Sequence, residues 1–335
     1  MKIIIPMAGM GKRMRPQTLT TPKPLIPISG KSIVQRLIEE LVKSVNTKVD
    51  EISFIIGEFG VEVEKMLKDI AKNLGIKSKI YYQNEALGTA HAIYCAKDSL
   101  DDSVIVAFAD TLFKSNFKFN KEEDGIIWVK KVENPKEFGV VKLDENDYIV
   151  DFIEKPDEYI SDLAIIGIYY FKDGNNLKDE IKYIIDKKIL VGKEYQLTTV
   201  LENMKNKGKK FAKGEVDLWL DCGNKIATIN TNTEILKSLP DWEKRENNFI
   251  IKNSVIIEPC YIGENVEIYD SVIGPNVSVE NGTKIKNSII KDSIIQSKCK
   301  IKNICFSNSM IGNSVEILEK INEFNFGDFT RIEND

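Results

Sequence analysis

Residues 2–24 read KIIIPMAGMGKRMRPQTLTTPKP, an apolar run followed by a glycine-containing turn and several basic residues. The run Lys2–Ile5 predicts a short buried strand, because it is aliphatic and ends at turn-forming residues. Gly9 and Gly11 carry no side chain, so backbone N–H groups of this turn can approach phosphate oxygens. The spacing fits neither the G-x-G-x-x-G of dinucleotide-binding folds nor the G-x-x-x-x-G-K-S/T of Walker loops. Both of those readings are therefore excluded.

Basic residues follow the glycines closely. Arg13, Arg15 and Lys23 supply positive charge that could neutralise a bound triphosphate. A Gly-x-Gly pair alone supports phosphate binding only weakly, because tight turns also need glycine for steric reasons. The whole string is more specific than its glycines.

Helix-like and strand-like segments alternate after this turn. Apolar residues at helical spacing predict helices at Ile33–Leu41 and Val63–Leu74. Short apolar runs predict strands at Glu51–Ile56, Lys79–Gln83 and Val104–Phe108. This alternation predicts a Rossmann-like α/β domain with a mostly parallel sheet covered on both faces. Ligands of such sheets bind at the carboxyl ends of the strands, so the turns after these strands hold the candidate site.

The same domain continues with further elements. Strand-like runs are followed by helical stretches, and we expect strands at Gly139–Leu143, Ile149–Glu154, Ile165–Phe171 and Leu218–Asp221. The expected helices are Leu177–Ile189, Leu197–Lys205 and Asn224–Leu236.

The sequence pattern changes near Pro240. Beyond a polar stretch, aliphatic or aromatic residues recur about every six positions, with small and turn-forming residues between them. They are Ile251, Ile256, Ile262, Ile268, Ile273, Val279, Ile285, Ile290, Ile295, Ile301, Phe306, Ile311 and Ile317. This period is too long for a strand and wrong for a helix, and ordinary hairpins would not keep it over so many repeats. It predicts a left-handed parallel β-helix with three short sides per coil and about four coils.

These patterns divide the chain into four parts. We predict an α/β domain over residues 1–240, a linker over 241–249, a β-helix over 250–318 and a tail over 319–335. The tail breaks the repeat and is expected to cap the open end of the β-helix. We expect the β-helix to serve assembly into a homo-oligomer and to be dispensable for chemistry.

The ordered residues of the N-terminal string resemble the signature of the sugar-1-phosphate nucleotidylyltransferases, usually written G-x-G-x-R, then P, then T, then P-K. The matching residues are Gly9, Gly11, Arg13, Pro16, Thr18, Pro22 and Lys23. The resemblance implies that the loop, including Ala8, wraps a nucleoside triphosphate. It also implies that Arg13 and Lys23 hold the phosphates and offset charge in the transition state.

Later motifs of this family follow in the expected order. Residues 83–90, QNEALGTA, are similar to the base-recognition segment, which implies nucleotide contacts by Gln83, Gly88 and Thr89. A glutamine can pair with a pyrimidine edge through both its donor and its acceptor. Asp110, at the end of a predicted strand, resembles the family's metal-binding aspartate.

The remaining motifs concern the sugar and the metal. Gly139 and the string Glu154-Lys155-Pro156 resemble the segment that contacts the sugar and its phosphate. Residues 195–198, YQLT, resemble a later sugar-side motif. Residues 219–223, WLDCG, match the W-x-D-x-G that carries the second metal aspartate, here Asp221. The resemblance covers about residues 1–236 and implies catalytic roles for Arg13, Lys23, Asp110, Lys155 and Asp221.

Three positions depart from the family pattern, and they concern the sugar site more than the nucleotide site. Thr199 stands where relatives commonly have aspartate, and Asn224 replaces a frequent threonine. The basic residue that often precedes the Tyr195 motif is represented only by Lys193.

Composition limits the possible partners and compartments. The 335 residues carry a net charge of -4, which argues against non-specific binding to nucleic acid. The five cysteines include no C-x-x-C pair, so reduced thiols in a cytoplasmic protein are expected. The sequence shows no export signal and no apolar run long enough for a membrane span.

The implied reaction is an in-line displacement that needs no general base, because a phosphate is already a competent nucleophile near neutral pH. We expect transfer from UTP or dTTP to a sugar 1-phosphate, with glucose 1-phosphate favoured. Asp110 and Asp221, each after an apolar run, are expected to converge at strand ends and to hold one Mg²⁺ between them.

Three alternatives remain open at this point. The first is acetyl transfer on the β-helix, but the only histidine, His91, lies outside the repeats and is expected to be structural or to act through a neighbour. The second is a mannose-1-phosphate guanylyltransferase, which shares the chemistry but uses a purine donor. The third is a non-catalytic regulatory subunit of the same fold.

Overall fold

The computed structural model describes residues 1–9, 11–45, 47–115 and 120–318. The chain divides into two compact units. The first contains Met1–Ile26 and Lys31–Thr228, and the second contains Pro27–Gly30 and the chain from Ile229 onward. The division falls inside helix α6 (Lys225–Ser238), and a short loop near the N-terminus belongs to the second unit. None of the described helices is long and apolar enough to cross a membrane.

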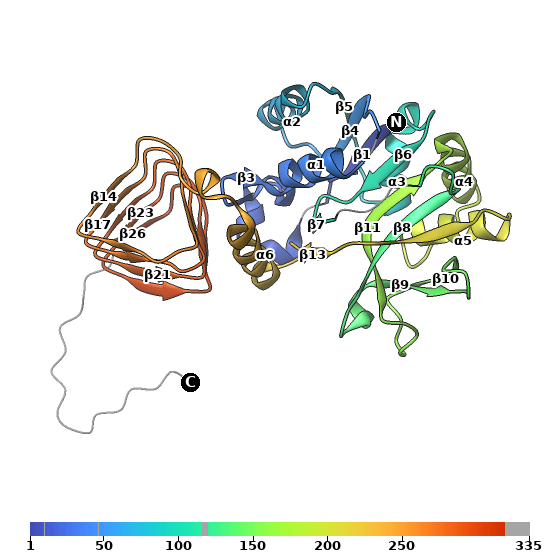
Figure 1. Cartoon of the computed structure of the whole chain (residues 1–335). Coiled ribbons are helices and arrows are strands. Elements are labelled where there is room, and N and C mark those ends of the chain that lie inside the picture. The colour runs from blue at the N-terminus through green and yellow to red at the C-terminus, as the bar shows by residue number, and fades with distance from the viewer. Residues whose placement is uncertain (10, 46, 116–119, 319–335) are drawn as a thin grey trace. The chain divides into compact units, whose positions relative to one another are not determined.

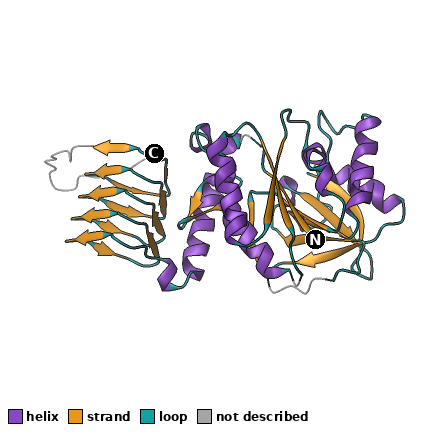
Figure 2. Ribbon diagram, turned by 90° about the horizontal axis from the view of Figure 1, so that it is seen from above, coloured by secondary structure: helices purple, strands orange, loops and turns teal. Residues whose placement is uncertain are grey.

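The first unit is built on a sheet whose central part is parallel (Figure 1). Its strands are β1 (Lys2–Pro6), β4 (Glu51–Ile56), β5 (Lys77–Tyr82) and β6 (Val104–Ala107), in the spatial order β5-β4-β1-β6. Ile3, Ile4 and Ile5 of β1 are fully buried, because helices cover both faces of the sheet (Figure 2). This confirms the α/β fold predicted from the alternation of strands and helices.

The helices of this unit connect or cover the strands. They are α1 (Ile33–Ser44), α2 (Val61–Asn73), α3 (Thr89–Cys95), α4 (Gly174–Asp186) and α5 (Leu197–Asn206). Helix α4 starts before the predicted Leu177, because the Asp173 side chain caps it by accepting from the backbone N–H of Asn176. The short strand β3 (Lys31–Ser32) precedes α1, and Ser32 caps that helix by accepting from the N–H of Gln35.

An antiparallel half extends the sheet beyond β6. Its strands are β8 (Gly125–Lys131), β9 (Gly139–Leu143), β10 (Ile149–Glu154), β11 (Leu163–Phe171) and β12 (Phe211–Glu215). β11 runs antiparallel to β6, β8 and β9, whereas β12 lies parallel to β8. Both β9 and β10 have the predicted bounds, whereas β12 was not predicted.

The order of the parallel strands determines where a ligand can bind. From β1 the chain proceeds to β4 and β5 on one side, and then returns to place β6 on the other side of β1. This reversal opens a crevice at the carboxyl ends of β1 and β6. The glycine-containing turn after Pro6 and the residues after Ala107 both lie at that edge.

The described part of the second unit contains a left-handed parallel β-helix, seen as a triangular coil in Figure 1. One side is formed by β14 (Ile250–Lys252), β17 (Glu267–Tyr269), β20 (Lys284–Lys286), β23 (Lys300–Lys302) and β26 (Glu316–Leu318). The second is formed by β15 (Val255–Ile256), β18 (Val272–Ile273), β21 (Ile289–Lys291) and β24 (Cys305–Ser307). The third is formed by β16 (Cys260–Ile262), β19 (Val277–Val279), β22 (Ser293–Ile295) and β25 (Met310–Ile311).

The predicted aliphatic repeat forms ladders along these sides. Ile251, Ile268, Ile285, Ile301 and Ile317 pair in register on the first side, at intervals of 16 or 17 residues. The other predicted positions form equivalent ladders on the second and third sides. The β-helix prediction is therefore confirmed.

The corners of the coils use asparagine and aspartate. Asn253, Asp270, Asn287 and Asn303 occupy one corner in successive coils, all with positive φ. These short polar residues tolerate the left-handed conformation that each sharp corner requires.

The segments around the β-helix are bonded to it within the second unit. In the predicted linker, the N–H of Glu246 donates to the carbonyl of Ile262, at a distance of 2.9 Å. In the N-terminal loop, which includes β2 (Pro27–Ile28), the N–H of Gly30 donates to the carboxylate of Glu280 at 3.0 Å. A chain ending near Pro240 would remove this partner of Gly30. The predicted tail, residues 319–335, lies outside the described residues.

Candidate functional site

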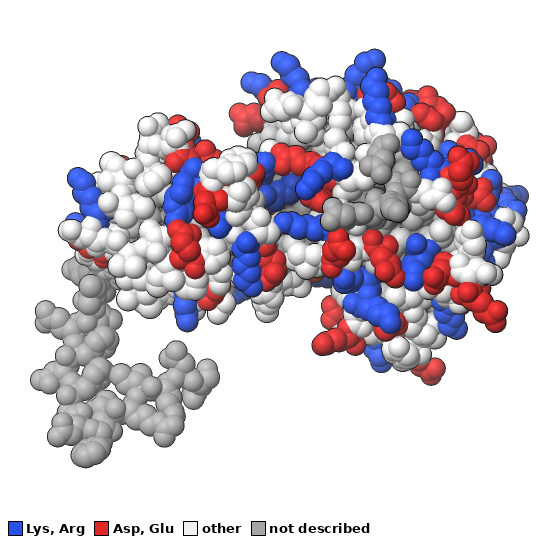
Figure 3. Space-filling model, in the orientation of Figure 1, with Lys and Arg blue, Asp and Glu red and all other residues white. Residues whose placement is uncertain are grey.

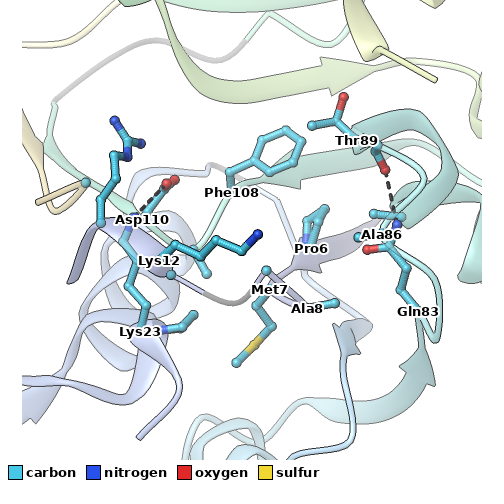
Figure 4. A pocket seen from close by; sticks show the side chains of 18 of the residues that line it. Pro6, Met7, Ala8, Lys12, Lys23, Gln83, Ala86, Thr89, Phe108 and Asp110 are labelled. Carbon is cyan, nitrogen blue, oxygen red and sulfur yellow. Dashed lines mark hydrogen bonds and ion pairs between the residues drawn. The ribbon is translucent and has the colours of Figure 1, made fainter. Parts of the chain in front are cut away.

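A pocket of about 400 Å³ opens at the carboxyl ends of β1 and β6 (Figure 4). The nucleotide-binding residues predicted from the sequence line it together with both predicted phosphate-binding side chains and one aspartate. They are Ala8, Gly9, Gly11, Gln83, Gly88, Thr89, Arg13, Lys23 and Asp110. The fold thus brings three distant segments of the chain to one cavity.

The glycine-containing loop has one sterically restricted glycine and one open glycine. Gly11 has φ +58°, and an added Cβ would lie 3.0 Å from Cβ of Lys23. At Gly9 an added Cβ would meet nothing within 4 Å. The hydroxyl of Thr18 donates to the Gly11 carbonyl at 2.8 Å and holds the turn in place. Gly11 is therefore required by the loop itself, whereas Gly9 leaves space in the pocket.

The basic residues of the loop are placed differently from one another. Lys23 is only 7% exposed, and its Nζ lies 2.9 Å from Oδ2 of Asp110. Arg13 is exposed and lines the pocket, whereas Arg15 does not line it. Lys12, to which the sequence had assigned no role, also lines the pocket and extends into it in Figure 4. Its position in the sequence, between the two glycines and Arg13, could have indicated that Lys12 belongs to the site.

A small antiparallel ribbon places the two aspartates beside each other. β7 (Thr111–Lys114) pairs with β13 (Leu218–Asp221), so Asp221 stands opposite Thr111, the neighbour of Asp110. The N–H of Cys222 also donates to the Asp110 carbonyl at 3.0 Å. The expectation that both aspartates end strands of the parallel sheet was wrong for Asp221, because β13 belongs to this ribbon.

Electrostatics at Asp221 reflect this proximity. Burial raises the pKa of its carboxyl, and the negative charge of Asp110 raises it further. The N–H of Gly223, which donates to Oδ1 at 2.8 Å, and the charges of Lys23 and Arg13 act in the opposite direction. The charge of Asp110 thus disfavours ionisation of Asp221, and a cation between the two carboxylates would relieve the repulsion.

The donor set fits Mg²⁺ in the way that nucleotide enzymes use it. Carboxylate oxygens are hard ligands, and Mg²⁺ is commonly held by one or two carboxylates together with substrate phosphates and water. Among the described residues, no group of three or more His, Cys, Asp or Glu side chains forms an all-protein metal cage. Asp110 and Asp221 therefore suit a metal ion that arrives with a phosphorylated ligand.

Backbone hydrogen bonds connect the expected base-recognition motif to the segment around Tyr195. The N–H of Tyr195 donates to the Leu87 carbonyl at 2.8 Å, and the Tyr195 carbonyl accepts from the N–H of Ala90 at 3.0 Å. Gly88 lies between these bonds with φ +105°, and an added Cβ would stand 2.5 Å from the Tyr195 carbonyl oxygen. The hydroxyl of Thr89 accepts from the N–H of Leu197 at 2.9 Å. The motif at residues 195–198 thus supports residues 87–90.

A second cavity of about 280 Å³ adjoins the first, and both are lined by Arg13, Thr89, Phe108 and Asp110. The second cavity also contains the predicted sugar-side residues and the other aspartate. They are Gly139, Glu154, Lys155 and Asp221. Gln196, Leu197, Thr198, Trp219 and Asn224, from motifs noted in the sequence, line it as well.

The sugar-side residues come from the hairpin of β9 and β10. Glu154 pairs across the strands with Gly139, where an added Cβ would lie 3.1 Å from Oε2 of Glu154. Glu154 is exposed as a residue, yet partial burial of its carboxyl raises the pKa of that group, and the charge of Lys155 partly offsets this effect. Lys155 itself has φ +43°, an unusual conformation that is often found at functional sites.

Charge is mixed on the face of the molecule shown in Figure 3. On the face shown in Figure 3, basic and acidic side chains intermingle without a continuous region of either sign. This agrees with the net charge of -4 and gives no support to a nucleic-acid interface.

Comparison with known proteins shows one family. The family model described as "Nucleotidyl transferase" matches residues 2–238. The protein called bifunctional protein GlmU from Methanocaldococcus jannaschii is 32% identical over 332 residues, covering 94% of this chain and 78% of its own. Glucose-1-phosphate thymidylyltransferase from Streptomyces antibioticus is 26% identical and covers 99% of both chains.

A further relative carries a different name. Probable mannose-1-phosphate guanylyltransferase 3 of Oryza sativa subsp. japonica is 30% identical, covering 93% of this chain and 86% of its own. Among solved structures, a UDP-glucose pyrophosphorylase complexed with UDP-glucose superposes with a TM-score of 0.60 at 23% identity. That match covers 71% of this chain and 99% of the solved chain, and at this identity it shows the fold alone.

Proposed function

The chain belongs to the nucleotidyl transferase family, and from this premise we propose that it transfers a nucleoside monophosphate from UTP or dTTP to a sugar 1-phosphate. Glucose 1-phosphate is the acceptor we propose to test first. The relatives include a thymidylyltransferase and a probable guanylyltransferase, so the choice of base depends on this chain's own residues.

One observation carries the proposal: two cavities meet at a shared border that contains Arg13 and Asp110. The first has the glycine-containing loop and suits a triphosphate, because backbone N–H groups and basic side chains surround it. The second has Lys155 and Glu154, a cation for a phosphate and an acceptor for hydroxyl groups. A reaction between two bound substrates would take place at the border.

The proposed chemistry is a direct displacement at phosphorus. An oxygen of the sugar phosphate forms a bond to the α-phosphorus, and the bond from that phosphorus to the pyrophosphate oxygen breaks. Arg13 and Lys23 would offset the charge of the leaving pyrophosphate, while Lys155 would orient the attacking phosphate. No residue needs to accept a proton, so the site does not require a histidine.

We also propose that Asp110 and Asp221 hold Mg²⁺. When bound, the ion supplies positive charge close to the α-phosphate. The adjacency of the two carboxylates and the raised pKa of Asp221 support this assignment. Lys23, paired with Asp110, would keep that carboxylate oriented toward the border of the cavities.

Two alternative functions, acetyl transfer and a non-catalytic regulatory role, have less support. Acetyl transfer by a β-helix generally uses a histidine base, and the only histidine, His91, lies on α3 outside the coils. A non-catalytic subunit would not need charged groups in its cavities. The cavities are nevertheless lined by Arg13, Lys23, Asp110 and Asp221. The guanylyltransferase remains the second candidate, because two relatives from Oryza sativa subsp. japonica carry the name probable mannose-1-phosphate guanylyltransferase.

Base preference provides the test of the proposed function. Pyrophosphate release is measured with UTP, dTTP, GTP and ATP at equal concentration, each with a panel of sugar 1-phosphates. UTP or dTTP should give the highest rate, and Gln83→Ala should erode discrimination more than it slows the best substrate. A clear preference for GTP would refute the proposed base, and absence of release with every pair would refute transfer.

Alanine substitutions at the two loop glycines should affect different properties of the protein. Gly9→Ala should fold normally but raise KM for the nucleotide several-fold, because the methyl group enters open space in the pocket. Gly11→Ala should lower the free energy of unfolding by about 1–2 kcal/mol, since it forces alanine to a left-handed conformation. Thermal unfolding and KM of each variant provide the comparison. An unchanged KM for Gly9→Ala would place the triphosphate elsewhere.

A further inference from the structure

The amide of Gln83 has a defined orientation in the first cavity. Its Nε2 donates to the Gly88 carbonyl at 3.2 Å and lies 3.2 Å from Nδ1 of His91. Figure 4 shows the amide nitrogen turned toward the Gly88 carbonyl and the amide oxygen turned toward the cavity. Within the described part of the chain, Oε1 accepts no hydrogen bond.

The Gly88 carbonyl fixes which end of the amide can face it. Gly88 is held between the two backbone bonds that join Leu87 and Ala90 to Tyr195. A carbonyl oxygen can only accept a hydrogen bond, so it favours the orientation in which the amide nitrogen of Gln83 is on its side. Reversal of the amide would place two oxygens together.

His91 supplies a second acceptor for the same nitrogen. Burial lowers the pKa of the imidazole, and the charge of Glu85 raises it to a lesser extent, so the ring is neutral at pH 7. Neutral His91 with its proton on Nε2 presents the Nδ1 lone pair to Gln83. The two N–H bonds of the Gln83 amide are then both used, by Gly88 and by His91.

We propose that His91 is a positioning residue for base selection, because it helps to fix the Gln83 amide with Oε1, and not Nε2, facing the base. An acceptor at this point suits the ring N–H of uracil or thymine and opposes cytosine, whose equivalent ring nitrogen is itself an acceptor. This inference rests on the proposed function, and it replaces the expectation that Gln83 would pair through both its donor and its acceptor.

Substitutions of His91 can distinguish a role in positioning the Gln83 amide from a role in packing alone. His91→Leu replaces the imidazole by an apolar side chain of similar size and removes the second acceptor. The Gly88 carbonyl alone then opposes reversal of the Gln83 amide, so the reversed amide, which offers N–H to cytosine, becomes more populated. His91→Asn retains a short polar acceptor near the place of Nδ1 and is the matched control. Gln83→Ala removes the group on which His91 is proposed to act.

The measurement is the ratio of dissociation constants for UTP and CTP, obtained by titration of the full chain. His91→Leu should reduce the preference for UTP about tenfold, the scale of one hydrogen bond, whereas His91→Asn should keep most of it. The double variant Gln83→Ala, His91→Leu should discriminate no worse than Gln83→Ala alone. If His91→Leu misfolds, His91→Ala, which also removes the acceptor, takes its place and should show the same loss of preference, and retained discrimination in a folded His91→Ala would overturn the proposal.

Several results would overturn it. Equal discrimination by the parent chain and a folded His91→Leu would reduce His91 to a packing residue. A loss in the double variant beyond that in Gln83→Ala would show that His91 acts independently of Gln83. Failure of the parent to prefer UTP would also contradict it. Binding does not require turnover, so a chain that discriminates UTP from CTP without releasing pyrophosphate would refute transfer and leave this inference standing.

Discussion

Asp110→Asn and Asp221→Asn should each lower turnover by about a hundredfold or more, on the scale of losing a major electrostatic stabiliser. Asparagine preserves the shape of the side chain and removes the charge. The β7–β13 ribbon places the two carboxylates beside each other, and we propose that they act on one cation. The two losses should therefore be far from additive, because either change weakens the same ion site.

The same substitutions should differ in their effects on folding. Asp221 has a raised pKa, so its ionised form opposes folding at pH 7, and Asp221→Asn should leave stability unchanged or increase it. That difference from the parent should disappear as the pH falls through the folded-state pKa of Asp221. Asp110→Asn should lower stability, because it weakens the ion pair of the buried Lys23. Thermal unfolding as a function of pH measures both effects.

Steady-state rates across a range of Mg²⁺ concentrations test the shared ion. Both single variants and the double variant are compared with the parent chain. Either single variant turning over normally at limiting Mg²⁺ would contradict the model. Losses that simply multiply in the double variant would assign the two aspartates to separate roles.

Gly88→Ala should abolish most nucleotide binding and lower the free energy of unfolding by about 3 kcal/mol or more, because it combines backbone strain with a steric clash. The added Cβ would stand 2.5 Å from the carbonyl oxygen and 2.8 Å from the amide nitrogen of Tyr195. Both are backbone atoms, and the bonds from Tyr195 to Leu87 and Ala90 oppose their movement. Relief of the clash would require these segments to separate.

Gly208→Ala is the matched control. Gly208 has φ +91°, close to the +105° of Gly88, but an added Cβ there would meet nothing within 4 Å. It therefore reports the strain of positive φ alone, about 1–2 kcal/mol. Thermal unfolding and UTP titration of both variants provide the comparison. Equal destabilisation would mean that the contact with Tyr195 has no structural role.

Much of the fold could be predicted because local patterns and tertiary structure agree. The aliphatic run in residues 2–5 forms the central strand, and the repeat from Ile251 to Ile317 forms continuous ladders. In both cases the spacing of the apolar residues along the chain predicts which of them are buried. The glycine-containing loop could also be recognised in the sequence, because the order of its residues resembles the family signature, and it lines the first cavity.

The remaining features depend on contacts between distant segments. β7 and β13 are short, and they form a ribbon only because they pair with each other. The Lys23–Asp110 pair and the support of Gly88 by Tyr195 likewise join residues far apart in the chain. The orientation of the Gln83 amide depends on two acceptors that the sequence motif does not specify. Local periodicity contains no information on such pairings.

The central claim is that two substrates react at the border of the two cavities. The most direct test incubates the purified chain with Mg²⁺, UTP or dTTP, and glucose 1-phosphate, and quantifies pyrophosphate and nucleotide sugar together. Pyrophosphate should appear only when both substrates are present, with one nucleotide sugar formed for each pyrophosphate released. Release that is independent of the sugar phosphate, or no nucleotide sugar from any pair in the panel of triphosphates and sugar 1-phosphates, would contradict the account.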